Sequence, residues 1–153
     1  MKRLIVNKWV LLALRLILGG IFIFAGAIKI AAPQSFADSI ASFQILSHGL
    51  IPPMALGLPV FEVLVGSMLI IAWQKRAAAF SALFLTAIFG IALFSALARG
   101  LQVDCGCFGG GTASVWKTWV SLGRDSLLGV AAFIAYRGTI SNENVALDIE
   151  RAK

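Results

Sequence analysis

The chain of 153 residues contains two cysteines, Cys105 and Cys107, with a single glycine between them. They lie in a glycine-rich stretch, Val103–Gly111, that separates two long apolar runs. A disulfide across one residue closes a very small ring, and Gly106 tolerates the unusual backbone angles that such a ring needs. Strain makes a disulfide easier to reduce, so this spacing favours thiol–disulfide exchange.

Other roles for the two cysteines are weaker. A structural cross-link over one residue removes almost no loop entropy, so it would stabilise little. A zinc or copper site would need further ligands, and the sequence offers only His48, with Met54 nearby. We therefore expect no metal. Inert buried cysteines are common, but the polar surroundings beside Asp104 argue against packing alone.

Ionisable residues inside the apolar runs are the second group of candidates. Such residues are costly in a membrane and usually face the interior of a helical bundle. Glu62, Arg124 and Asp125 fall at matching depths in their runs, and we expect Glu62 to pair with Arg124. Asp125 would then pair with Lys29 or Arg99. This cluster either fixes helix register or forms a polar pocket beneath the cysteines, where Lys29 and Arg99 favour a thiolate.

The amino-acid composition indicates that these residues lie on or between membrane-spanning helices. Apolar residues make up 59% of the chain and charged residues 13%, whereas soluble domains carry about 25% charged residues. A soluble helical bundle would also need polar helix faces, and the run 77–98 has none. We predict an all-α integral membrane four-helix bundle, with spans at about residues 9–30, 54–73, 77–98 and 116–136.

Lysine and arginine residues predict the orientation. They flank the amino terminus, the connection between the second and third spans and the carboxyl-terminal region, but are absent from Ala31–Pro53. We expect a multi-pass protein of the bacterial inner membrane, with both termini cytoplasmic and the cysteine loop periplasmic. Residues 1–138 would form the membrane domain, and 139–153 a loosely ordered polar cytoplasmic tail. The net charge of +6 then reflects orientation and lipid attraction, not nucleic-acid binding.

The first outer connection is predicted to contain a short interfacial helix. Pro33 is suited to open it, and Ser35-x-x-Asp38 resembles a capping box. Apolar residues recur at helical spacing at Phe36, Ile40 and Phe43. We expect this helix to lie in the outer interface with those residues facing the membrane, either as a lid on the bundle or as a docking surface.

Three motifs resemble the MauE-like branch of the DoxX-like membrane protein family. They are Gly19–Lys29, Pro59-x-x-Glu62-x-x-x-Gly66, and Arg99-Gly100 followed by Cys105-Gly-Cys-Phe-Gly109. The resemblance covers roughly 14–129, and its most specific part is Cys-Gly-Cys-Phe-Gly after a third span. It implies a four-helix membrane protein. The matching site positions are Lys29, Glu62, Arg99, Cys105 and Cys107.

The resemblance also implies a function. MauE proteins are associated with methylamine utilisation, where they are needed to mature the disulfide-rich small subunit of methylamine dehydrogenase. Related proteins occur with thioredoxin-like periplasmic partners, and DoxX-type relatives include a quinone-linked subunit. We therefore expect a thiol–disulfide oxidoreductase that links a periplasmic thioredoxin-fold partner or disulfide-rich client, through Cys105 and Cys107, to a membrane carrier, most plausibly quinone.

An alternative class is a non-enzymatic assembly or anchoring factor that holds a periplasmic partner at the membrane. Membrane enzymes that oxidise dithiols with quinone usually carry a second cysteine pair, and this chain has only one. The sequence therefore leaves open whether the protein is an enzyme. It also leaves open a homodimer.

Overall fold

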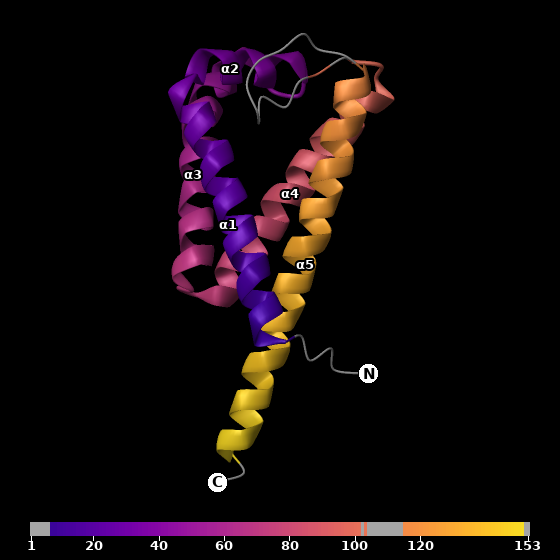
Figure 1. Cartoon of the computed structure of the whole chain (residues 1–153). Coiled ribbons are helices and arrows are strands. Elements are labelled where there is room, and N and C mark those ends of the chain that lie inside the picture. The colour runs from indigo at the N-terminus through magenta and orange to yellow at the C-terminus, as the bar shows by residue number, and fades with distance from the viewer. Residues whose placement is uncertain (1–6, 102, 104–114, 152–153) are drawn as a thin grey trace.

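The computed structural model describes residues 7–101, 103 and 115–151. For residues 115–117 and 143–151 it describes the backbone but not the side chains. The described chain is helical, as predicted, and contains no strand. Cys105 and Cys107 lie outside the described residues. The helices in Figure 1 are α1 (Lys8–Ala31), α2 (Pro33–Ser42), a 3-10 turn (His48–Leu50), α3 (Ile51–Ile71), α4 (Lys75–Ala98) and α5 (Val115–Arg151).

Three described segments are long and apolar enough to cross a membrane. They are α1, α3 together with the preceding turn (His48–Ile71), and α4. Their outer faces carry large exposed apolar side chains, such as Leu56 and Ile91 at 64% and 69% exposure, which suits contact with lipid. These helices support a multi-pass membrane protein. The fourth span stays a prediction, because α5 carries Arg124 and Asp125 in its apolar part.

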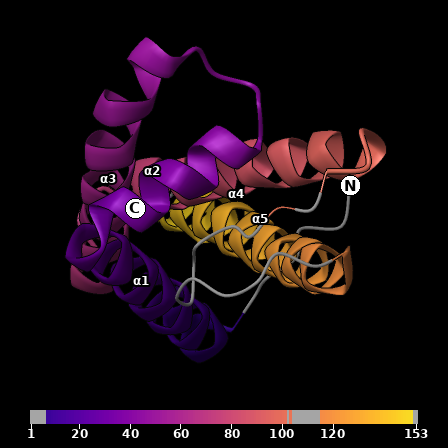
Figure 2. The same cartoon turned by 90° about the horizontal axis from the view of Figure 1, so that it is seen from above.

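The long helices form two pairs. α1 packs against α3 and α4 packs against α5, while contacts of α1 with α5 and of α3 with α4 join the pairs. In Figure 1 the pairs lie close together where α1 begins and diverge toward α2. Figure 2 shows α2 lying across the ends of α1 and α3, with which it makes contact. A core of leucine, phenylalanine, valine and alanine side chains joins the two pairs.

Glycines allow the close approach of α1 and α3. A Cβ added to Gly19 would lie 2.7 Å from the carbonyl oxygen of Gly66, and one added to Gly66 would lie 2.7 Å from that of Gly19. A Cβ on Gly26 would lie 2.7 Å from the carbonyl oxygen of Pro59. Small residues let membrane helices pack backbone to backbone. Two of the three sequence motifs therefore pack against each other.

α2 confirms the predicted short helix and corrects its start. Pro33 occupies the first turn, where a missing N–H costs nothing. The predicted capping box is wrong, because Ala32 is the N-cap residue and Ser35 lies inside the helix. Phe36 is buried, and the other two apolar residues of the predicted face are half-buried. The apolar face of α2 thus packs on the protein.

α4 ends in a turn that requires glycine. Gly100 has φ +69°, in the left-handed region. Its N–H bonds the carbonyl of Leu97 at 3.0 Å, and the N–H of Leu101 bonds the carbonyl of Ala96 at 2.9 Å. These are the paired bonds of a Schellman motif. The Arg99-Gly100 motif therefore marks the residue at which the helix stops.

α5 continues well beyond the predicted fourth span. The helix runs to Arg151 over 37 residues, so the prediction of a loosely ordered tail is wrong for residues 139–151. This segment contains neither glycine nor proline apart from Gly138 just before it, so no residue type in it stops a helix. The Thr139 hydroxyl donates to the carbonyl of Ala135 at 2.8 Å and is buried.

Candidate functional site

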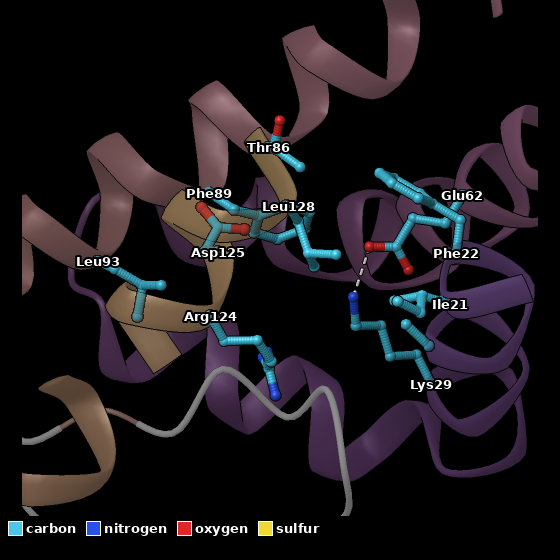
Figure 3. Close-up of a pocket in the computed structure, with 11 residues that line it drawn as sticks. Ile21, Phe22, Lys29, Glu62, Thr86, Phe89, Leu93, Arg124, Asp125 and Leu128 are labelled. Carbon is cyan, nitrogen blue, oxygen red and sulfur yellow. Dashed lines mark hydrogen bonds and ion pairs between the residues drawn. The ribbon is translucent and has the colours of Figure 1, made fainter. Parts of the chain in front are cut away.

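Lys29 and Glu62 form an ion pair in the interior of the protein (Figure 3). Lys29 Nζ lies 2.5 Å from Glu62 Oε1, and the two side chains are 1% and 3% exposed. Lys29 occupies the last turn of α1, where the helix dipole favours a cation. Each charge alone would be very costly to bury, and the pairing offsets that cost. The predicted site residues of two motifs therefore meet directly.

Two aromatic rings complete the surroundings of the Lys29 ammonium. Its Nζ lies 5.0 Å from the ring centre of Phe36 in α2 and 4.8 Å from that of Phe89 in α4. A ring face attracts a cation more strongly when water is excluded. One ammonium thus contacts side chains from three helices besides its own, and it ties α2 to both helix pairs.

A cavity of about 50 Å³ lies beside the ion pair, between the two helix pairs (Figure 3). Side chains of α1, α3, α4 and α5 all contribute to its lining. A cavity of this size has room for water. Sites for organic ligands are several times larger, at about 300 Å³ or more. In this form the cavity therefore suits water and protons and does not accommodate a quinone ring.

Arg124 and Asp125 line the same cavity from α5. Glu62 forms an ion pair with Lys29, which we did not predict. The predicted pairings of Glu62 with Arg124 and of Asp125 with Lys29 or Arg99 stay predictions. Asp125 lies beside α4, where a Cβ added to Gly90 would be 3.0 Å from Asp125 Oδ2. The similar depth of these residues along their apolar runs correctly predicted that they lie near one another, but it did not predict which of them form ion pairs.

Arg99 lies away from the ion pair and bonds to backbone carbonyls, and its predicted role at the cysteines stays a prediction. Its guanidinium donates to the carbonyls of Phe43 at 2.6 Å and Gln44 at 3.4 Å, and its Nε donates to that of Ser95 at 3.1 Å. It is not among the residues that line the cavity. Carbonyls at a helix end lack donors within the helix. Arg99 therefore joins the end of α4 to the end of α2.

The residues next to the cysteine-containing connection are anchored. Val103 is 1% exposed, and its carbonyl accepts a hydrogen bond from the Thr118 hydroxyl at 3.0 Å. Leu101 and Leu122 pack on the same small core. Val103 is thus fixed against α5, at the end of the protein that holds α2. The predictions for Cys105 and Cys107 themselves fall outside the described residues.

Among the cavity residues that we did not predict as site residues are Thr86 and Phe89. Both lie in α4, the helix whose apolar run contains no charge inside it. Together with Leu93 they recur at spacings of three and four residues, which places them on one helix face. The Thr86 hydroxyl donates to the carbonyls of Ala82 and Leu83 within its own helix. The hydroxyl of Thr86 within this apolar helix face is the sequence feature that could have indicated the cavity.

Comparison with known proteins agrees with this arrangement. The family described as methylamine utilisation protein MauE matches residues 7–137. The methylamine utilization protein MauE of Paracoccus denitrificans is 30% identical over 139 residues, which cover 90% of this chain and 74% of that protein. The MauE protein of Methylorubrum extorquens is 32% identical over 106 residues, covering 69% and 56% of the two chains.

A third relative, MauE of Paracoccus versutus, is 29% identical over 117 residues, which cover 76% of this chain and 62% of that protein. No solved structure is significantly similar to the chain. The matched family region begins at the N-cap of α1 and includes the Lys29–Glu62 pair, Arg99, both cysteines and the start of α5. This chain therefore belongs to the MauE family, as its motifs predicted.

Proposed function

We propose that the protein is a membrane thiol–disulfide redox protein in which Cys105 and Cys107 are the reacting groups. They would exchange electrons between a periplasmic thioredoxin-fold partner, or a maturing disulfide-rich protein, and a quinone in the bilayer. The Cys-Gly-Cys spacing carries this proposal. The helices that flank the connection, α4 and α5, end and begin at the α2 end of the protein (Figure 1). The relatives are named for methylamine utilisation, so a client in that process is our first choice.

The proposed cycle balances as follows for oxidation of a client. A client thiolate attacks the Cys105–Cys107 disulfide, forms a mixed disulfide with one cysteine and releases the other as a thiolate. A second client thiolate breaks the mixed disulfide, which leaves a client disulfide and two cysteine thiols. Reoxidation of these thiols releases two electrons and two protons, and a quinone accepts them to become a quinol. The reverse sequence would reduce a partner.

The cavity beside Lys29 and Glu62 supports a role in proton movement. Thiol reoxidation releases protons, and the small cavity beside this buried ion pair has room for water that could carry them. The carrier itself needs more space. A groove of about 350 Å³ between α4 and α5, lined by Thr86, Gly90, Asp125 and Ser126 among others, falls in the range of small-molecule sites. Asp125 lines both spaces, so we assign quinone contact to this groove.

Trapping of the mixed disulfide tests the reaction. Cys105→Ser and Cys107→Ser are made separately in the full chain, and membranes are analysed on non-reducing gels. We expect one single variant to hold a covalent complex with a periplasmic partner that a reductant releases. The double variant is the control and should hold none. A functional double variant, with no trapped partner in either single variant, would favour the assembly or anchoring factor instead.

A second measurement tests the quinone groove. Gly90→Leu fills the groove, and Gly57→Leu is the matched control, since an added Cβ at Gly57 meets nothing within 4 Å. We expect Gly90→Leu to slow quinone-dependent reoxidation of the cysteines while partner trapping stays normal. Equal reoxidation rates in the two variants would remove the groove from the proposal but leave the thiol chemistry intact.

A further inference from the structure

We propose that the end of the protein opposite α2 contains a binding site for the phosphate group of an anionic phospholipid. The site is a cavity of about 530 Å³ lined by α1, the first residue of α4 and α5. Its volume falls in the range of sites that hold small molecules. This inference does not depend on the proposed redox function, because it concerns different residues at the other end of the helices.

Three cations line this cavity, namely Lys8, Arg15 and Lys75. The described residues that line it include no carboxylate, while Thr139 and Asn142 add a hydroxyl and an amide. Like charges gathered in one space repel each other. An anion among the three cations would remove that repulsion, and the polar side chains would add hydrogen bonds to its oxygens.

Arg15 points most clearly to a missing ligand. It is only 8% exposed, and its Nη2 donates to the carbonyl of Leu69 at 2.9 Å. Leu69 lies within the last turn of α3, where carbonyls lack intrahelical donors. The buried Nε of Arg15 has no hydrogen-bond partner among the described residues. A buried charged donor without a partner is costly, and a phosphate oxygen would satisfy it.

Two helix N-termini add to the positive potential. α1 begins at Lys8 and α4 begins at Lys75, so both helices start at the rim of the cavity. In α1 the Trp9 N–H donates to the side chain of the N-cap residue Asn7 at 3.1 Å, whereas the α4 N-cap residue, Gln74, makes no side-chain capping bond. Free N–H groups at helix N-termini bind phosphates, and a lysine there opposes the helix dipole unless an anion is present. Both features favour an anionic ligand.

Apolar side chains at the same cavity select a lipid over free phosphate. Trp9 and Leu12 line it and are 67% and 41% exposed, so the cavity opens on an apolar face of α1. Tryptophan prefers the interface of a membrane. A ligand with an anionic head and acyl chains matches a space that is cationic inside and apolar at its edge. Basic pockets between membrane helices hold such headgroups.

The test uses the full chain purified in a neutral detergent. Phosphatidylglycerol, phosphatidylcholine and inorganic phosphate are titrated separately, with bound ligand followed by native mass spectrometry and stability by the unfolding temperature. We expect phosphatidylglycerol to bind and to raise the unfolding temperature, and phosphatidylcholine to do neither. Lys8→Gln and Lys75→Gln should each weaken phosphatidylglycerol binding about fivefold, and about 25-fold together.

Arg137→Gln is the matched control, because it removes an exposed cation of α5 that does not line the cavity. It should leave the affinity unchanged. Arg15→Gln also removes the bond to α3 and is expected to unfold more easily, so the two exposed lysines carry the test. Equal binding of phosphatidylcholine, or an unchanged affinity in the double lysine variant, would overturn the proposal. Binding of inorganic phosphate without phosphatidylglycerol would overturn the assignment to a lipid.

Discussion

The two ends of the protein each bury a basic side chain of α1, and they compensate its charge differently. At the α2 end, Lys29 has a carboxylate partner, Glu62, at 2.5 Å. About 21 Å away along α1, Arg15 bonds the carbonyl of Leu69 at 2.9 Å and has no carboxylate partner among the described residues, and it shares its cavity with two lysines. The ion pair at the first site is neutral, whereas the described residues that line the second site carry three positive charges. This excess of positive charge is the basis of the anionic ligand that we propose there.

This difference also separates the functions that we propose for the two ends. A neutral, enclosed pair beside a small cavity suits the transfer of protons without a bound anion. An open cationic cavity suits the capture of a headgroup. Between them, the glycine contacts of α1 with α3 keep the two sites in a fixed relation.

Breaking the Lys29–Glu62 pair should give the largest effect. Glu62→Gln leaves the buried ammonium without its carboxylate, and we expect a loss of about 3–5 kcal/mol in the free energy of unfolding. Denaturant unfolding in detergent measures it. Lys29→Met should have a similar cost, because it leaves the buried Glu62 carboxylate without its ammonium partner.

The double variant Lys29→Met/Glu62→Gln sharpens this comparison. With both charges removed, we expect most of the stability to return, because the penalty of each single variant comes from the charge left behind. If the pair also moves protons, the double variant will fold but reoxidise its cysteines slowly. Additive losses in the double variant would show that the two residues are not coupled.

A smaller loss is expected at the α1–α3 contact that positions this pair. Gly26→Ala places a Cβ 2.7 Å from the Pro59 carbonyl oxygen, so the helices must separate. We expect a cost of about 1–3 kcal/mol in unfolding free energy. Gly20→Ala is the control on the same helix, since its added Cβ meets nothing within 4 Å. It should be neutral or stabilise by up to about 1 kcal/mol, and equal losses at both positions would argue against the glycine contact.

The smallest effect should come from Arg99, whose hydrogen bonds are exposed. Arg99→Gln removes the link between α4 and α2, and we expect a loss of about 0.5–1.5 kcal/mol. Hydrogen exchange should increase in α2 and stay unchanged in α1. Arg137→Gln serves as the control and should leave exchange in α2 unaltered. Unchanged exchange in α2 after Arg99→Gln would show that packing of Phe36 alone holds this helix.

Much of the fold was predictable because bilayer-crossing helices need long apolar runs. The runs at 9–30, 54–73 and 77–98 correspond closely to helices of the structure, and Pro33 opens the short helix between the first two. The carboxyl-terminal tail was not predictable from its polarity. A polar composition removes the reason to enter a membrane, but it does not prevent a helix that has already formed from continuing.

The sequence by itself determined which residues are charged within apolar helices, how deep they lie, and that two cysteines share a short loop. The position of a residue in its apolar run restricts its height along the helix, and the helical period restricts the helix face on which its side chain lies. Only the tertiary structure decided that Glu62 pairs with Lys29, that Arg99 serves α2, and that Arg15 joins two lysines in one cavity. The physical reason is that these pairings depend on which helix faces which, and small contacts between glycine backbones decide that packing.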